Sequence, residues 1–336
     1  MNYILVTGAN GEVGHGLIQK LKGQDVKTKT IAVYHNVLDL VMSKNADILI
    51  KADVTDNNLI GNIFNKYNIT TIYHLAAVLS TGGEKNPELA HEVNIGGTYN
   101  LLSIANRFAS AEKRVIKFIF PSTIAVYGMM NKKQKEINNK PKEEEFLNPI
   151  TMYGINKLYC ENLGNYFSSY YKLLSTDHFR GIDFRCVRFP GLISADTIPT
   201  GGTSDYAPEM LHSAAQGKDY SCFVRPDSKI HFMAMPDAID ALLKLTNTHK
   251  KKLERNVYNI SGFSATAQEI EKMVKKHFPK AKITYNVDPA RQRIIDSWSE
   301  DVDDSEAVKD WGWKAKYGFR KAFEEYLIPS IKNKYR

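Results

Sequence analysis

Residues 3–14 read YILVTGANGEVG, an apolar run that leads directly into a cluster of glycines. The run Tyr3–Val6 is typical of a short strand buried in a parallel sheet. Gly8, Gly11 and Gly14 follow it in a GxxGxxG pattern, and an apolar-periodic helix comes next. Glycines in this order permit a tight turn and let the backbone approach a pyrophosphate, which the amide groups at the helix N-terminus then face. The stretch therefore predicts a strand, turn and helix that bind a dinucleotide.

Strand-like and helix-like patterns continue to alternate as far as about residue 178. Alternation of this kind predicts a doubly wound parallel sheet with right-handed crossovers. The lysine-rich stretch 131–145 is polar and non-periodic, which predicts a surface loop. The strands that we expect after the first cover residues 30–34, 47–51, 71–75, 118–121 and 184–189, and the helices between them include 57–67, 87–107 and 152–171.

Tyr153 and Lys157 form a YxxxK pair on the helix expected over 152–171. Four residues make about one helical turn, so the phenol and the ammonium share one face. A phenol with a reference pKa of ~10 is a poor base at neutral pH, and an ammonium beside it favours the phenolate. Two such residues on a solvated helix are common, so the other motifs decide how this pair is interpreted.

Two of the expected strands end in residues suited to a ligand site, at the edge where parallel sheets bind their ligands. The strand at 118–121 delivers the hydroxyls of Ser122 and Thr123. An ST turn that merely closes this strand is the alternative interpretation. The strand at 71–75 ends in a leucine followed by two alanines, and such small residues let a flat ring lie against the backbone.

Together these elements resemble the extended short-chain dehydrogenase/reductase family over essentially the whole chain. The resemblance implies a Rossmann-type doubly wound parallel sheet with a smaller C-terminal α/β substrate-binding domain. Residues 1–190 would form the NAD-binding domain and residues 191–336 mainly the substrate-binding domain, with some segments returning to the Rossmann core. NAD is the implied cofactor, and no metal is implied.

The resemblance also implies roles for single residues. Tyr153 would be the general base, and Lys157 would lower the pKa of Tyr153 and bind the nicotinamide ribose. Thr123 would orient the substrate hydroxyl, with Ser122 as the alternative for this role. The implied contacts to the cofactor are Gly8, Asn10, Gly11, Glu12, Val13, Gly14, Asp53, Val54, Leu75, Ala76, Ala77, Tyr153, Lys157, Pro190 and Leu192.

One expected cofactor contact is missing. The second strand should end in an acid that binds the adenosine ribose hydroxyls, but residues 32–36 read AVYHN. No arginine replaces the acid, so a phosphorylated cofactor is not indicated either. Asp53 resembles the family's adenine contact, and NAD remains the expectation.

Five strings in the second half of the chain narrow the function. They are PGLIS at 190–194, GGTSDYA at 201–207, MPDA at 235–238, DSW at 296–298 and DDS…DWGW at 303–313. Their combination resembles the branch of the family that oxidises L-threonine at C3 to 2-amino-3-oxobutanoate with formation of NADH. Ser299 departs from this branch, which commonly has proline there. The implied substrate contacts are Ser80, Thr123, Tyr153, Thr203, Asp205 and Trp298, although Trp298 could instead be a core residue.

Two other functions remain open from the sequence. An NAD-dependent nucleotide-sugar epimerase or dehydratase would need basic residues for a diphosphate, for which Arg225 and Arg291 are candidates. A sensor or scaffold that binds NAD without chemistry is the third possibility. The presence of both Tyr153 and Lys157 disfavours it.

Composition excludes several classes. The 336 residues suffice for one large or two closely packed domains. The formal net charge is +8, but basic residues are interleaved with acids and form no stripe with aromatics, so nucleic acid is not an expected partner. No signal-like segment or apolar run near 18 residues occurs, so a membrane is not expected. We expect a cytoplasmic enzyme, or a mitochondrial one if a transit peptide was removed.

The three cysteines, Cys160, Cys186 and Cys222, show no CxxC spacing. They are typical of buried thiols in a reducing compartment. The nine histidines show no HExxH pattern, so a catalytic zinc is not expected.

Partners follow from the family resemblance. Extended members often form homodimers through the helix with the Tyr/Lys pair and the helix before the fifth strand. An apolar stripe suits this contact and the protein core equally well; it comprises Tyr159, Leu163, Phe167 and Tyr170. Coupling to a 2-amino-3-oxobutanoate–CoA ligase is a further expectation.

Overall fold

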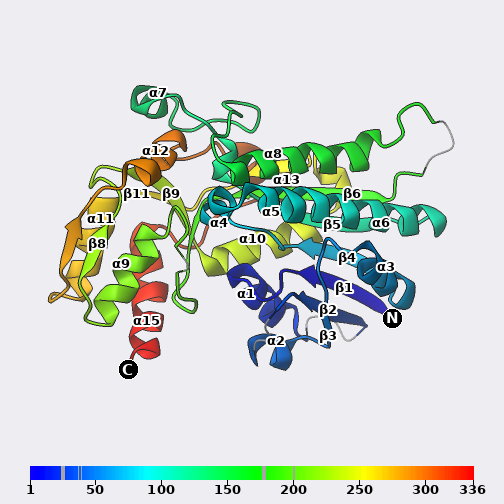
Figure 1. Cartoon of the computed structure of the whole chain (residues 1–336), viewed down its shortest axis with the longest axis horizontal. Helices are drawn as coiled ribbons and strands as arrows, with labels where there is room; N and C mark the ends of the chain where they lie inside the picture. The colour runs from blue at the N-terminus through cyan, green and yellow to red at the C-terminus, as the bar shows by residue number, and fades with distance from the viewer. Residues whose placement is uncertain (24–26, 37, 39, 176–178, 200) are drawn as a thin grey trace. The chain divides into compact units, whose positions relative to one another are not determined.

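The computed structural model describes residues 1–23, 27–36, 38, 40–175, 179–199 and 201–336 (Figure 1). Two compact units interleave along the chain. Unit 1 comprises Met1–Ser122, Ile155–Val187 and Ile239–Val257, and unit 2 comprises Thr123–Gly154, Arg188–Ala238 and Tyr258–Arg336. The expectation that residues 1–190 bind NAD and that residues 191–336 mainly bind the substrate remains a proposal.

A seven-stranded sheet has the strand order β10-β6-β5-β4-β1-β2-β3. Strand β1 pairs in parallel with both β2 and β4, and the β2–β3 and β4–β5 pairs are also parallel. Successive strands are therefore added first on one side of β1 and then on the other, as in doubly wound folds. This confirms the predicted fold class. The strands are β1 (Asn2–Thr7), β2 (Thr28–Tyr34), β3 (Ile48–Lys51), β4 (Ile69–His74), β5 (Ile116–Thr123), β6 (Ile182–Phe189) and β10 (Val257–Asn259).

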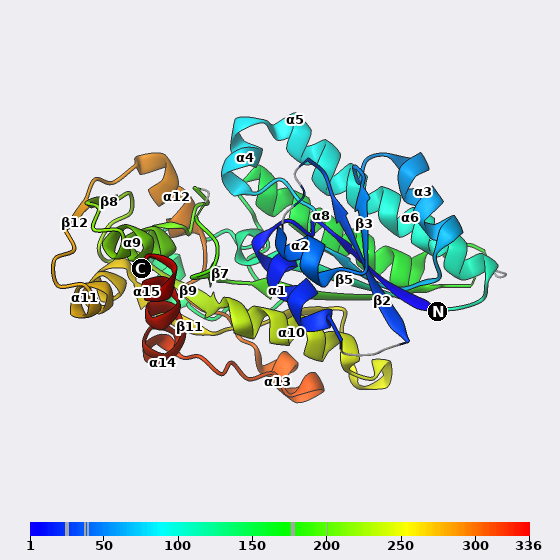
Figure 2. The same cartoon turned by 90° about the horizontal axis from the view of Figure 1, so that it is seen from below.

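Helices cover both faces of this sheet (Figures 1 and 2). One face carries α1 (Glu12–Leu21), α2 (Leu40–Asn45) and α10 (Met235–Asn247). The other carries α3 (Asn57–Lys66), α6 (Gly97–Ala111) and α8 (Met152–Asn165). The shorter elements are α4 (Ser80–Lys85), α5 (Pro87–Ala90), the π-helical turns η1 (His91–Gly96) and η3 (Tyr166–Tyr170), and the 3-10 turns η2 (Ile124–Val126) and η4 (Lys250–Lys252).

The core of unit 1 explains why the strand predictions succeeded. Leu5, Ile31, Ile72 and Phe118 are each fully buried, one on each of four neighbouring strands. Strands covered on both faces consist of nearly continuous apolar runs, and these runs are what the sequence displays. Cys160, Cys186 and Cys222 are free and buried, as expected.

Unit 2 contains two small sheets. In the first, β9 (Lys229–Ala234) pairs antiparallel with β11 (Phe263–Thr266) and parallel with β7 (Gly191–Ile193). In the second, β8 (Tyr220–Cys222) pairs in parallel with β12 (Ile283–Tyr285). The helical elements are α7 (Lys132–Ile137), α9 (Tyr206–Ala215), α11 (Ala267–His277), α12 (Pro289–Ser297), α13 (Ser305–Trp311), α14 (Phe319–Lys321), η5 (Ala322–Leu327) and α15 (Ile328–Lys334).

Two local predictions need correction. The expected loop at 131–145 contains helix α7, and two of its charged residues, Lys135 and Glu143, are buried. The helix expected over 87–107 is a composite of α5, the π-helical turn η1 and α6. Within the described ranges, no helix combines the length and apolar character that crossing a membrane requires.

Candidate active site

The turn between β1 and α1 lies against the end of β4. Gly8 has φ +64°, which favours glycine. A Cβ atom on Gly8 would lie 2.7 Å from the Cα atom of Ala76, so only glycine fits this approach. The structure thus brings together two of the predicted cofactor segments, the glycine turn and the end of β4. The turn leaves Asn10, Gly11 and Glu12 exposed, with Val13 half-buried and Gly14 buried.

The N-terminus of α1 suits an anionic ligand. Its N-cap is Gly11, and no side chain caps the helix there. Helix N-termini present amide donors and the positive end of the helix dipole. The turn and helix therefore fit a pyrophosphate, the group that NAD would place there.

Asp53 follows β3 and is paired with a histidine. Its Oδ1 accepts hydrogen bonds from the backbone N–H of Thr55 at 2.9 Å and from the Thr55 hydroxyl at 2.8 Å. Its Oδ2 lies 3.2 Å from Nε2 of His35, just beyond β2. Burial acts to raise the pKa of Asp53, but the Thr55 hydrogen bonds and the His35 charge hold it below its usual range. Asp53 is therefore an ionised acceptor, and His35 occupies the region where the family's ribose-binding acid was expected. The adjacent Val54 is buried.

A buried polar network under the glycine turn escaped the sequence analysis. His74 Nδ1 lies 2.7 Å from Thr7 Oγ1, and His74 Nε2 lies 2.9 Å from Thr98 Oγ1. Burial lowers the pKa of His74 to about 3, so the ring is neutral. The signal in the sequence was a polar residue at the end of each apolar strand, Thr7 in β1 and His74 in β4. The network ties β1, β4 and α6 together.

Lys157 is fixed at the end of β5. Its Nζ donates to the carbonyl oxygen of Pro121 at 2.7 Å and lies 4.3 Å from the ring centre of Phe120. Burial lowers the pKa of Lys157 to about 8, opposed by the nearby Cys160, Cys186 and Glu161. The group therefore remains largely an ammonium at neutral pH.

Of the two candidate hydroxyls, Thr123 is the accessible one. Ser122 is buried, and its Oγ has no hydrogen-bond partner among the residues that the structure describes. Thr123 is half-buried, and its Oγ1 accepts from the backbone N–H of Ala125 at 3.2 Å. This exposure favours Thr123 over Ser122 as the group that meets a substrate.

Tyr153 stands in the first turn of α8, four positions before Lys157 on the same helix. It is half-buried, and burial raises the pKa of its phenol. A Cβ atom on the next residue, Gly154, would lie 2.9 Å from the carbonyl carbon of Ala125. The first turn of α8 therefore meets the backbone two residues after Thr123.

The remaining predicted residues have varied environments. Ser80 begins α4 and is buried, while Leu75, Ala76 and Ala77 are half-buried. Pro190 is buried and Leu192 half-buried, and Thr203 and Trp298 are buried. Asp205 accepts from the backbone N–H groups of Gly201 at 3.0 Å and Gly202 at 2.6 Å, so its carboxylate holds the GG turn.

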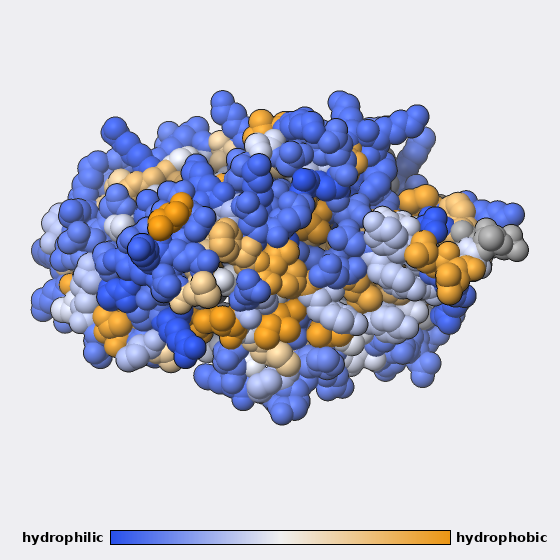
Figure 3. All heavy atoms as spheres, turned by 90° about the horizontal axis from the view of Figure 1, so that it is seen from above, coloured by the Kyte–Doolittle hydropathy of each residue, from blue (hydrophilic) through white to orange (hydrophobic). Residues whose placement is uncertain are grey.

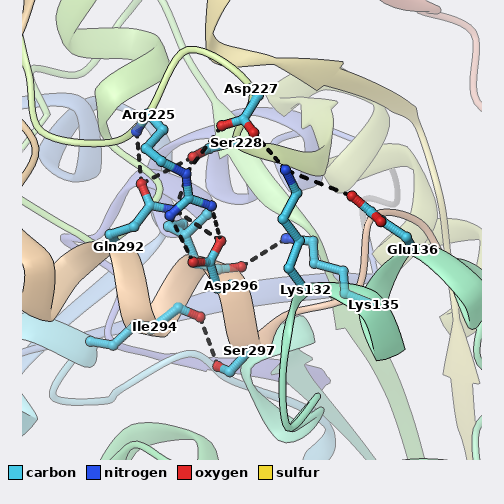
Figure 4. A network of polar contacts seen from close by, with 11 residues as sticks. Lys132, Lys135, Glu136, Arg225, Asp227, Ser228, Gln292, Ile294, Asp296 and Ser297 are labelled. Atoms are coloured by element: carbon cyan, nitrogen blue, oxygen red, sulfur yellow. Dashed lines mark hydrogen bonds and ion pairs between the residues drawn. The ribbon is translucent and has the colours of Figure 1, made fainter.

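The two arginines considered for a diphosphate have other partners. Arg225 pairs with both oxygens of Asp296 at 2.9 and 3.0 Å and with Asp227 at 3.1 Å (Figure 4). Arg291 lies 4.2 Å from the ring centre of Phe223 and donates weakly to the Gly201 carbonyl at 3.5 Å. Both arginines are therefore already engaged by other groups of the protein.

A doubly wound sheet, a glycine turn at the first helix and a tyrosine–lysine pair on α8 define the class of short-chain dehydrogenases and reductases. The chain belongs to the NAD dependent epimerase/dehydratase family, whose profile matches residues 4–261.

Several named proteins are similar over most of the chain. The mitochondrial L-threonine 3-dehydrogenase of Bos taurus is 36% identical over 315 residues, which cover 93% of this chain and 78% of the bovine one. The structure of an L-threonine dehydrogenase from Clostridium difficile has a TM-score of 0.86 and 36% identity, covering 99% of this chain and 98% of that chain. A monomeric L-threonine 3-dehydrogenase from a metagenome database, in its apo form, has a TM-score of 0.85 and 36% identity, covering 99% of this chain and 100% of that chain.

Proposed function

We propose that this protein is an NAD-dependent dehydrogenase that oxidises L-threonine at C3 to 2-amino-3-oxobutanoate. The names of its relatives support this substrate. The observation that carries the chemistry is the buried Lys157 ammonium, anchored on Pro121 at the end of β5 and on the same helix as Tyr153. A fixed cation on that helix is what a tyrosine base requires.

In the proposed reaction the C3 hydroxyl of threonine loses its proton to the Tyr153 phenolate. The C3 hydrogen leaves with its electron pair as a hydride, and a carbon–oxygen double bond forms. NAD, when bound, supplies the hydride acceptor, chemistry that belongs to the cofactor. Thr123 hydrogen-bonds the reacting oxygen and fixes its position for Tyr153.

The charge of Lys157 has a specific task in this proposal. Burial raises the pKa of the Tyr153 phenol, which opposes its use as a base. An ammonium near the phenol stabilises the phenolate and lowers the pKa again. The fixed Lys157 ammonium is our candidate for that charge, and it also binds the nicotinamide ribose in the family's manner.

For the cofactor, we propose that the pyrophosphate lies at the N-terminus of α1 and the adenine near Asp53. The pairing of His35 with Asp53 at 3.2 Å supports a ribose site at the ends of β2 and β3 despite the missing acid. In this arrangement the imidazole of His35 would offer its other nitrogen to a ribose hydroxyl.

The amino-acid substrate is a zwitterion, and burying its charges without partners would be costly. Our proposed contacts are Ser80, Thr203, Asp205 and Trp298, in addition to Thr123 and Tyr153. A nucleotide-sugar epimerase or dehydratase remains the alternative, but the engagement of Arg225 with Asp296 and Asp227 argues against a diphosphate at Arg225.

We also propose a homodimer formed through α6 and α8. Their exposed large residues include Tyr99, Ile155 and Tyr159, with Tyr166 and Tyr170 in η3 beyond α8. Figure 3 shows the side on which α8 lies, where hydrophobic residues and residues of intermediate hydropathy occur between hydrophilic ones. The predicted stripe is only partly exposed, because Phe167 is buried. One relative is described as monomeric. Analytical ultracentrifugation of the purified protein would therefore test whether it is a monomer or a dimer. Coupling to a CoA ligase remains a proposal from the family alone.

The test makes two measurements on the purified protein. With NAD and L-threonine, we expect NADH to appear and the protein to arrive from purification without tightly held cofactor, since a dehydrogenase must release NADH each turnover. NAD that stays bound through purification, with no reaction of L-threonine, would support the epimerase alternative instead.

A further inference from the structure

The last turn of α12 is held by a buried lysine from α7 (Figure 4). Lys135 is only 3% exposed, and its Nζ donates to the carbonyl oxygen of Ile295 at 2.8 Å. Carbonyl groups in the last turn of a helix have no intrahelical partner and carry the negative end of its dipole. An ammonium at this position satisfies one of them and stabilises the end of α12.

The same carbonyl fixes the residue that follows the helix. The backbone N–H of Trp298 also donates to the carbonyl oxygen of Ile295, at 3.3 Å. One residue earlier, the carbonyl oxygen of Ser297 accepts from the backbone N–H of Met129 at 2.8 Å. Met129 lies six residues after Thr123 in the chain. Lys135 therefore bonds to the same oxygen that accepts from the main chain of Trp298.

A second contact holds the same turn of α12 through its side chains. Arg225 forms two parallel hydrogen bonds with the Asp296 carboxylate. Gln292, one turn earlier on α12, accepts from the backbone N–H of Arg225 at 2.7 Å. Lys132 of α7 reaches Asp227 at 2.6 Å, so α7 and the turn at 225–228 are joined (Figure 4). We refer to Lys135, Arg225 and Asp296 together as the α12 clamp.

Burying Lys135 requires compensation. An ammonium removed from water is costly unless it is paired and hydrogen-bonded. Burial lowers the pKa of Lys135 to about 8, opposed by the charges of Asp296 and Glu300. Lys133, two residues earlier on the same short helix, is exposed and has no such role. The lysine-rich segment therefore combines solvated lysines with one that serves an internal contact.

We propose that Lys135 is a positioning residue for the amino-acid substrate, because the α12 clamp fixes where Trp298 stands. This inference rests on the proposed function, in which Trp298 contacts L-threonine. Lys135 itself touches neither substrate nor cofactor in this account. It acts through Ile295 on the main chain of Trp298.

The experiment compares Lys135→Met with Lys133→Met in the full-length protein. Methionine retains most of the apolar stem of lysine but has no ammonium that could donate to the Ile295 carbonyl. Hydrogen exchange by mass spectrometry would follow the peptides that contain Met129 and Trp298. We expect faster exchange there in Lys135→Met and unchanged exchange in Lys133→Met.

Steady-state kinetics supply the functional readout. Misplacing a substrate contact should raise the KM for L-threonine by about tenfold or more, with kcat and the KM for NAD changed far less. Lys133→Met should match the wild type. Asp296→Asn, which weakens the pairing with Arg225 on a more exposed side chain, should raise the same KM if Lys135→Met fails to fold.

The outcomes separate the two claims. Unchanged exchange at Met129 and Trp298 in both variants would overturn the clamp. Faster exchange with an unchanged KM for L-threonine would overturn its role in substrate positioning. If the wild type does not oxidise L-threonine at all, the proposed function fails, and with it the substrate-positioning role, while the exchange data still decide whether the clamp holds α12.

Discussion

A Cβ atom on Gly154 would lie 2.9 Å from the carbonyl carbon of Ala125, and closer still to its oxygen. Gly154 follows Tyr153, and Ala125 lies two residues after Thr123, whose hydroxyl caps the turn at 124–126. The two proposed catalytic hydroxyls are therefore carried by segments whose backbones touch. Their spacing depends on the absence of one side chain.

Gly154→Ala should consequently separate Tyr153 from Thr123. Alanine normally stabilises a helix relative to glycine by up to ~1 kcal/mol, but here the methyl group meets backbone that cannot rotate away. We expect kcat to fall by about 10²-fold, with NAD affinity measured by fluorescence titration nearly unchanged. Gly96→Ala is the matched control, because a Cβ atom there meets nothing within 4 Å. Equal activity in both variants would show that Gly154 does not set the spacing of Tyr153 and Thr123.

Thr123→Ala should slow turnover by on the order of 10²-fold, since the substrate oxygen loses its hydrogen-bonding partner. Ser122→Ala should be nearly silent, because the Ser122 hydroxyl is buried. Steady-state rates at saturating L-threonine and NAD provide the comparison. The reverse pattern would show that the reacting hydroxyl belongs to Ser122.

Lys157→Met should move the pH dependence of the reaction. A general base acts when deprotonated, so kcat/KM should rise with pH until Tyr153 is ionised. Without the ammonium, the phenolate is less favoured and the rising limb should shift to higher pH. The measurement is the pH–rate profile of the wild type and the variant. A lower rate with an unshifted limb would leave Lys157 as a cofactor contact only.

Asp53→Asn should weaken NAD binding by about tenfold while kcat at saturating NAD stays nearly constant. The substitution would remove the negative charge that pairs with His35 and that we propose accepts a hydrogen bond from the adenine. Asp47→Asn serves as the control, because Asp47 lies at the opposite end of β3, where it accepts from Thr30 N–H. Equal NAD affinity of Asp53→Asn and Asp47→Asn would contradict this adenine site.

Two buried histidines should make folding sensitive to acid. Burial lowers the pKa of His74 to about 3 and that of His231 to about 4. Between these values and about 6.5 the unfolded chain binds protons that the folded chain does not. Above about pH 6.5 the two histidines should therefore leave the free energy of unfolding unchanged. Below that pH the free energy of unfolding should fall by up to about 1.4 kcal/mol per pH unit for each histidine.

Denaturant titrations at pH 7 and pH 5 would measure this loss. His74→Gln should lose only about half as much stability between these pH values, because His231 still contributes its share. The exposed His91→Gln should behave like the wild type. If all three proteins lost the same free energy of unfolding between pH 7 and pH 5, His74 would not be neutral in the folded state.

Features that depend on neighbours in the chain could be predicted from the sequence, and features that depend on distant residues could not. Apolar runs and the glycine turn are local signals, so the strands from β1 to β6 and the start of α1 were predictable. The role of Lys135 was not, because its partner Ile295 lies 160 residues away. Glu143 likewise accepts from the distant Asn259 N–H, at 3.0 Å. A lysine-rich segment has the composition of a loop until such partners are known.

The site shows the same contrast. Tyr153, Lys157 and Thr123 could be proposed from spacing and resemblance, since the chemistry requires those residue types. The network of His74 with Thr7 and Thr98 and the pairing of His35 with Asp53 depend on which strands are neighbours. Single side chains in the sequence do not reveal such pairs.

The most direct test of the central claim is the appearance of NADH at 340 nm, with purified protein, NAD and one of four amino acids. These are L-threonine, L-allo-threonine, D-threonine and L-serine. We expect a strong signal with L-threonine and little with the other three amino acids, and we expect Tyr153→Phe to lose the signal with L-threonine. No signal with L-threonine under conditions where the protein is folded and binds NAD would contradict the proposed function.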